Sequence, residues 1–116
     1  MLDTINLDFI KTEIGNDPAV ICEMLILFQE VLTEFEDSLV LAIGERSYPV
    51  AFITTHKIKP SLKMFELQEL ISKTTILETL IKQKVDFSII QKEFAEIQTL
   101  LPDTHANIEQ LLLQYQ

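Results

Sequence analysis

The residues best able to do chemistry in this sequence are a histidine and the lysines that follow it, in the segment Thr55-His56-Lys57-Ile58-Lys59-Pro60-Ser61-Leu62-Lys63. The chain has 9 Lys and Arg against 18 Asp and Glu, so this lysine-rich segment locally reverses the sign of the charge. A histidine can act as a nucleophile or carry a proton near neutral pH. Lysine ammonium groups beside it can neutralise an incoming phosphoryl group. The segment therefore indicates phosphoryl chemistry.

Other candidate sites in the sequence are weaker. His56 and His105 lie far apart and neither has a His-x-x-x-His or Glu-x-x-His pairing, so we expect no metal site. Two glycines are too few for a phosphate-binding loop, so we expect no ATP site. We interpret Cys22 as a small core side chain, His105 as helix surface, and the acidic runs at 34–37 and 93–96 as solvated faces.

Length and composition bound the class of protein. A chain of 116 residues with 47% hydrophobic residues can form one domain, which we place at 1–116. Few glycines and prolines, with much Leu, Ile, Glu, Lys and Gln, predict an all-α fold. One cysteine, no signal peptide and no long apolar run lead us to expect a cytoplasmic protein. The net charge of -9 argues against nucleic acid and anionic membranes as partners.

Apolar residues at intervals of three and four predict the helices that must position His56. A short helix within Ile5 to Thr12 is followed by a long one that begins at the capping pair Asp17-Pro18. We expect Gly44 to end this long helix in the left-handed position that follows a helix. The next helix opens at Ser47 and contains His56, and its inner positions are Ala51, Thr55, Ile58, Leu62 and Phe65.

Two further helices complete the prediction. One runs from about Leu67 to Lys82, and the last begins after the capping residue Asp86. Its apolar spacing continues across Pro102, so we expect one helix that bends there. Four long amphipathic helices with short links predict an antiparallel up-down four-helix bundle, with the short N-terminal helix as an addition.

The histidine is expected on the outside of this bundle. His56, Lys59, Pro60 and Lys63 fall three and four residues apart, on a face away from the inner positions. We therefore predict that the His56 ring is exposed near the middle of its helix and has no strong partner within the protein.

The segment around His56 resembles the signature of the histidine-containing phosphotransfer (HPt) domain. That signature is an Ala/Thr-His-x-Leu-Lys-Gly-Ser/Ala run on the second long helix of a four-helix bundle. The matching residues here are Thr55, His56, Ile58, Lys59 and Ser61, and Lys57 matches a variant of the family that has His-Lys-Ile-Lys. With the order of the helices included, the resemblance extends over roughly residues 7–113.

This resemblance implies a phosphorelay intermediate without kinase or ATPase activity of its own. His56 would accept a phosphoryl group from the aspartate of a response-regulator receiver domain and pass it to another receiver. Lys59 would contact the phosphoryl oxygens, and Lys57, Pro60 and Lys63 would form the docking face for the receiver. The implied partners are receiver domains and a hybrid sensor histidine kinase. We expect a monomer without a cofactor, with Mg²⁺ only on the receiver.

The chain departs from the family at two positions. Pro60 stands where the family has a glycine, and proline frees the His56 carbonyl and should bend the helix. Glu66 stands where a second family glycine helps to end the helix, and a left-handed cap is unfavourable for Glu. These departures leave open a helical adaptor that binds receivers or kinases without being phosphorylated. A piece of a larger kinase is a weaker alternative, because capping at both ends favours a free-standing chain.

Overall fold

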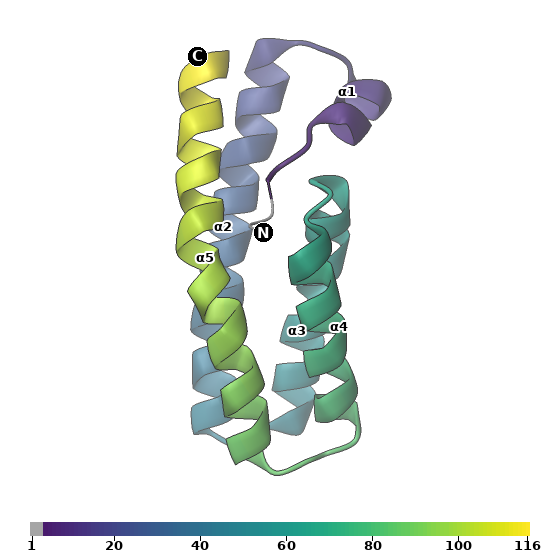
Figure 1. The fold of residues 1–116 in the computed structure, drawn as a ribbon, viewed down its shortest axis with the longest axis vertical. Helices are drawn as coiled ribbons and strands as arrows, with labels where there is room; N and C mark the ends of the chain where they lie inside the picture. Colours follow the sequence, from purple (N-terminus) through teal and green to yellow (C-terminus); the bar gives the residue numbers. More distant parts are fainter. Residues whose placement is uncertain (1–3) are drawn as a thin grey trace.

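A computed structural model describes residues 4–116, which form five α-helices and no strand (Figure 1). The helices are α1 (Asp8–Ile14), α2 (Pro18–Gly44), α3 (Tyr48–Met64), α4 (Gln68–Lys82) and α5 (Phe87–Tyr115). The predicted all-α class is confirmed for this part of the chain. None of these helices is long and apolar enough to cross a membrane.

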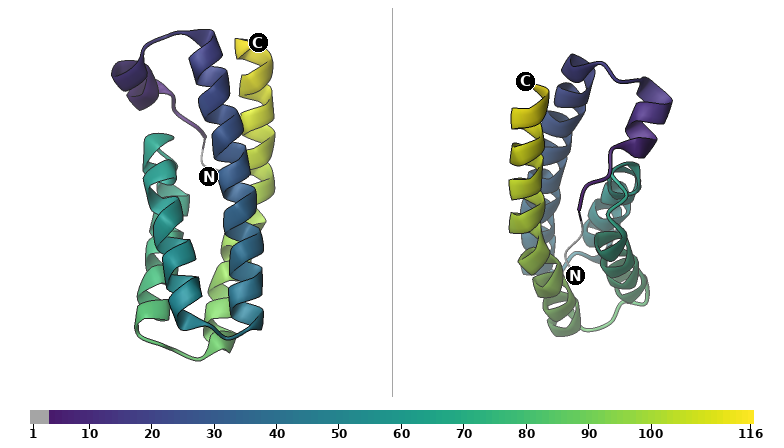
Figure 2. Two further views of the ribbon diagram at one scale, coloured as in Figure 1. Left: turned by 180° about the vertical axis from the view of Figure 1, so that it is seen from behind. Right: turned by 45° about the horizontal axis from the view of Figure 1, so that its top comes forward.

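The four long helices stand side by side and alternate in direction, as the views in Figures 1 and 2 show together. α2 packs against α3 and α5, and α4 packs against the same two helices. The described residues measure 45 × 25 × 23 Å. The helices therefore surround one core, which lies along the long axis of the molecule.

Most of the core consists of apolar positions at the spacings of three and four that predicted the helices. The buried residues of the two longest helices are Ile21, Leu25, Phe28, Leu32, Phe35, Leu39, Ala42 and Ile43 on α2, and Ile90, Phe94, Ile97, Leu101, Thr104 and Ile108 on α5. Two pairs of aromatic rings in this core join α2 to other parts of the chain, namely to the residue after α3 and to α5. The rings of Phe28 and Phe65 stack with centroids 4.2 Å apart, and Phe35 meets Phe94 edge-on at 6.2 Å. Burial of this apolar surface is the main force that holds the helices together.

The N-terminal segment fills the end of the molecule where α2 and α5 extend beyond α3 and α4 (Figure 1). The first helix is Asp8–Ile14, so only the second part of the predicted segment Ile5 to Thr12 is helical, and the helix continues two residues further. Residues 4–7 are irregular because their backbone binds other elements. The Ile5 N–H donates to Asn107 Oδ1 at 2.8 Å, and the Asn6 N–H donates to the Phe65 carbonyl at 3.1 Å. Ile5 itself is buried, so the segment adds to the core.

The helix ends correct two predictions. Gly44 is the last residue of α2, and the left-handed residue is Arg46, with φ 56°. Glu66 also takes a left-handed conformation, with φ 57°, although a side chain makes this unfavourable. Lys84, after α4, is left-handed as well. In all three turns the residue after the left-handed one donates a backbone hydrogen bond to a carbonyl in the last turn of the preceding helix. The N–H groups of Ser47, Leu67 and Val85 donate to the carbonyls of Ala42, Leu62 and Leu80, respectively.

Two prolines lie inside continuous helices. α5 includes Pro102, and Figure 1 shows that its lower, green half is inclined to its upper, yellow half. α3 continues through Pro60 to Met64, so this proline does not end the helix. Both prolines lie on the exposed side of their helices, so a bend at either one does not displace their own rings from the core.

Candidate functional site

His56 lies near the middle of α3, on its outer surface. Its side chain is 69% exposed, whereas Thr55 and Ile58, its neighbours on the core side, are buried. The prediction of an exposed histidine on a helix is therefore confirmed. The ring stacks on Phe52, one turn earlier on α3, with centroids 5.7 Å apart and planes 13° from parallel.

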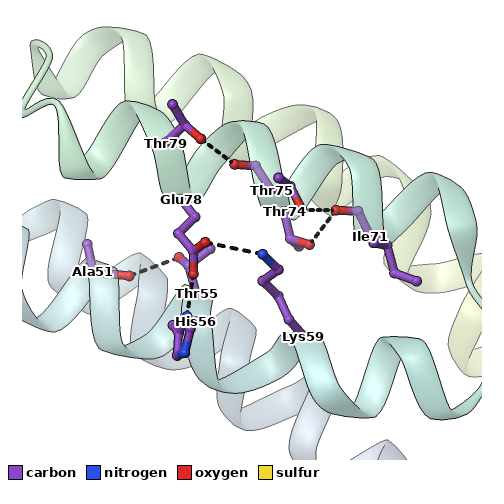
Figure 3. A network of polar contacts seen from close by, with 9 residues as sticks. All are labelled: Ala51, Thr55, His56, Lys59, Ile71, Thr74, Thr75, Glu78 and Thr79. Carbon is purple, nitrogen blue, oxygen red and sulfur yellow. Dashed lines mark hydrogen bonds and ion pairs between the residues drawn. The ribbon is translucent and has the colours of Figure 1, made fainter.

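The expectation that the ring has no strong partner is wrong. His56 Nδ1 lies 2.6 Å from Oε2 of Glu78, which belongs to α4 (Figure 3). The other carboxylate oxygen, Oε1, accepts a hydrogen bond of 3.2 Å from Lys59 Nζ. Glu78 therefore joins the histidine and the lysine from the neighbouring helix. We call His56, Lys59 and Glu78 the α3–α4 triad.

The packing of α3 against α4 creates this triad. His56 and Lys59 are one helical turn apart on α3, and the antiparallel α4 places Glu78 opposite both. The buried hydroxyls nearby are satisfied within their own helices. Thr55 donates to the Ala51 carbonyl at 2.9 Å, and Thr74 donates to the Leu70 carbonyl at 2.7 Å. Neither hydroxyl therefore competes for the carboxylate.

The charges of the triad favour an ionised Glu78. Burial of this side chain acts to raise its pKa, but hydrogen bonds from His56 and Lys59 outweigh that effect and lower the pKa below the ordinary glutamate value. The carboxylate is only 16% exposed and the Lys59 side chain 18%, so solvent screens their interaction less than on an open surface.

The ionised Glu78 determines which ring nitrogen can react. A carboxylate accepts the proton of Nδ1–H, which leaves the lone pair of the imidazole on Nε2. Nε2 has no hydrogen-bond partner among residues 4–116, and Figure 3 shows it directed away from Glu78. The triad thus presents one oriented, basic nitrogen to solvent, with a lysine beside it. Such a group is suited to attack on an electrophile that carries negative charge.

The other predicted site residues lie on different sides of His56. Lys57 Nζ lies 3.6 Å from Glu34 Oε1 on α2, and both side chains are well exposed. Pro60 and Lys63 are exposed on α3, as predicted. Lys59 is not on an open stripe with them, because its ammonium group is directed to Glu78. The structure therefore brings Lys59 to the histidine and puts Lys57 toward α2.

The side chains set aside in the sequence occupy ordinary structural positions. Cys22 is half-buried on α2, and its thiol donates to the Tyr115 carbonyl at 3.2 Å. His105 is half-buried on α5, somewhat less exposed than expected for helix surface. Within the acidic run at 34–37, Glu36 accepts a hydrogen bond of 3.1 Å from Gln98.

Sequence reasoning missed Glu78 and Phe52. Glu78 is 22 residues from His56, and no motif joins the two positions. The only available signal was its place beside the buried Leu77, at the edge of the inner face of α4. Pairing it with His56 required the register between two helices, which the sequence pattern does not specify.

No protein-family model matches the sequence, and neither a curated protein nor a solved structure gives a match. Function must therefore be inferred from the site itself.

Proposed function

We propose that this chain is a phosphocarrier that accepts a phosphoryl group on Nε2 of His56 and passes it on. The observation that supports this most strongly is the 2.6 Å contact between His56 Nδ1 and Glu78, because it leaves Nε2 as an exposed nucleophile. Lys59, on the same carboxylate, adds a cation within reach of an incoming phosphoryl group.

The transfer needs few groups from this chain. Nε2 attacks the phosphorus of a phosphoaspartate on the partner, the Nε2–P bond forms, and the bond between phosphorus and the aspartate oxygen breaks. The aspartate leaves as a carboxylate, and the reverse reaction delivers the group to the next partner. Because Nδ1 keeps its proton, the phosphorylated ring is formally cationic. The carboxylate of Glu78 stabilises that positive charge as it develops.

Lysines supply the complementary charge for the phosphoryl oxygens. Lys59 can turn from Glu78 toward the new phosphoryl group without leaving its helix position, since ammonium groups bind phosphate as mobile point charges. Lys63 is exposed one turn further along α3 and adds to the same positive surface. We assign phosphoryl stabilisation to Lys59 and docking of the partner to Lys57, Pro60 and Lys63.

The resemblance to HPt domains names the partner class. In this proposal the ring of four antiparallel helices is the HPt four-helix bundle with an added N-terminal helix. Receiver domains exchange the phosphoryl group with His56, and a hybrid sensor kinase supplies it. Mg²⁺ belongs to the receiver. The chain acts in the cytoplasm as a monomer, within one domain over 1–116, and does not hydrolyse ATP.

The test is receiver-driven phosphorylation of the native chain and of His56→Gln. A purified phosphorylated receiver should transfer an acid-labile phosphate to the native chain and none to the variant. Glutamine can still donate a hydrogen bond to Glu78, so we expect the free energy of unfolding to stay within about 1 kcal/mol. Binding of the receiver without any phosphate on His56 would instead identify the chain as a docking adaptor.

A further inference from the structure

A groove between α3 and α4 begins next to the α3–α4 triad. It has a volume of about 340 Å³ and is lined by Tyr48, Pro49, Phe52, Ile81, Lys82 and Lys84. Phe52 precedes His56 by one helical turn, and Ile81 follows Glu78 by almost one turn. The groove therefore starts within about 6 Å of the triad, measured along either helix axis.

The floor of this α3–α4 groove is held in place by contacts within the protein. The Tyr48 hydroxyl donates to the Val85 carbonyl at 2.7 Å, and its ring lies against Phe87 with centroids 4.3 Å apart. The Phe52 ring stacks on the ring of His56. An apolar side chain from a partner would enter a surface that needs little rearrangement, which lowers the entropic cost of binding.

The rim of the α3–α4 groove is positively charged. Lys82 and Lys84 are both exposed, and neither forms an ion pair with another residue of 4–116. Across the wider α3–α4 half, residues 48–84 contain six lysines and only three glutamates. A partner with carboxylates around an apolar side chain would be attracted to this rim.

The groove on the other side of α3 has the opposite character. It lies between α2 and α3 and has a volume of about 130 Å³, and two of its lining residues, Lys57 and Glu34, already pair with each other. Next to it, α2 presents Glu30 and Asp37 to solvent. An acidic partner would be repelled there, because like charges brought together at an interface cost several kcal/mol.

We infer that the partner that exchanges the phosphoryl group with His56 docks over the α3–α4 groove. It places an apolar side chain between Phe52 and Ile81 and carboxylates against Lys82 and Lys84. This inference rests on the proposed function and adds the direction from which the partner covers the histidine. It moves the centre of the docking face away from Lys57 and toward α4.

The experiment compares two phosphodonors on the same variants. The first donor is a receiver domain phosphorylated on its aspartate, and the second is phosphoramidate, a small molecule that needs no docking surface. Lys82→Glu and Lys84→Glu should each slow receiver-driven labelling, relative to phosphoramidate labelling, by about tenfold at low salt. The effect should shrink as ionic strength rises. The matched control is Lys92→Glu, which makes the same charge change at an exposed position of α5 and should not alter the ratio.

The outcomes separate the two proposals. If Lys84→Glu and Lys92→Glu change receiver-driven labelling equally, the docking inference is wrong while the phosphocarrier function stands. The same conclusion follows if charge reversal at Glu30 or Asp37 on α2 slows transfer more than the lysine variants do. If phosphoramidate leaves His56 of the native chain unlabelled, the proposed function fails, and the docking inference fails with it.

Discussion

The two halves of the molecule, α2 with α5 and α3 with α4, differ in length, in charge and in their polar contacts. α2 and α5 extend the full length, and α2 has five acidic side chains and no basic one. α3 and α4 are shorter, and α3 has three lysines and no acidic residue. The polar triad and two of the buried threonines lie in the α3–α4 half. Both halves contribute fully buried residues to the core, and the α3–α4 half carries the reactive surface in addition.

The largest expected effect is on stability, at the fully buried Phe28 of α2 compared with the half-buried Phe52 of α3. Phe28→Ala removes a fully buried ring that stacks on Phe65, and we expect a loss of about 3–5 kcal/mol in the free energy of unfolding. Phe52→Ala, at the half-buried ring beside His56, should cost less than half as much. Urea unfolding of both variants measures this. Equal losses would contradict the expectation that the more deeply buried ring contributes more to stability.

The next largest effect is expected on the rate of phosphoryl transfer to His56. Glu78→Gln keeps the size of the side chain but loses the charge that orients the histidine and stabilises the cationic product. Loss of the carboxylate that orients a metal-binding histidine typically costs about 10–100-fold in affinity or activity, and we expect transfer from His56 to slow by a similar factor. Glu36→Gln is the matched control on α2, where Gln98 is the partner, and should leave the rate unchanged. If Glu78→Gln accepts the phosphoryl group as fast as the native chain does, Glu78 takes no part in the mechanism.

The pH dependence of stability should report the ionised state of Glu78. The folded-state pKa of Glu78 is lowered, so its contribution is present above the unfolded-state pKa and is lost as the pH falls through the lower, folded-state value. Unfolding free energies of the native chain and Glu78→Gln should therefore differ at neutral pH and converge in acid. A difference that grows on acidification would contradict the assigned sign.

The smallest effect concerns the helix ends. Arg46, after α2, and Glu66, after α3, both have left-handed backbones, in which glycine is less strained. Arg46→Gly should raise the free energy of unfolding by about 1 kcal/mol. Glu66→Gly should raise it further, because Glu66 Oε2 is buried without a hydrogen-bond partner among residues 4–116. Thermal melts rank the two, and a larger gain for Arg46→Gly would show that the buried carboxylate is not a source of instability.

The sequence predicted what depends on a single helix. Apolar spacing located the four long helices and most of the core, and the caps at Asp17, Ser47 and Asp86 occur as expected. Exposure of His56 followed from its phase relative to Ile58 and Leu62. The spacing did not reveal Glu78, because a contact between α3 and α4 depends on their register. It also failed at Arg46 and Glu66, whose left-handed backbone lets Ser47 and Leu67 donate hydrogen bonds back to the ends of α2 and α3, against the local preference of these residues.

The pairing of the helices in space has a consequence for how fast the chain folds. Three of the four packed pairs, α2–α3, α3–α4 and α4–α5, are consecutive in sequence and joined by links of three or four residues, and only α2–α5 closes a long loop. Folding speed rises as contacts become more local, and helical proteins with such connections fold in about microseconds to milliseconds. The α3–α4 hairpin that carries the triad requires no distant contact to form. The reactive surface therefore depends mainly on contacts that are local in sequence, and closing the long loop between α2 and α5 carries the largest entropic cost of the four helix pairs.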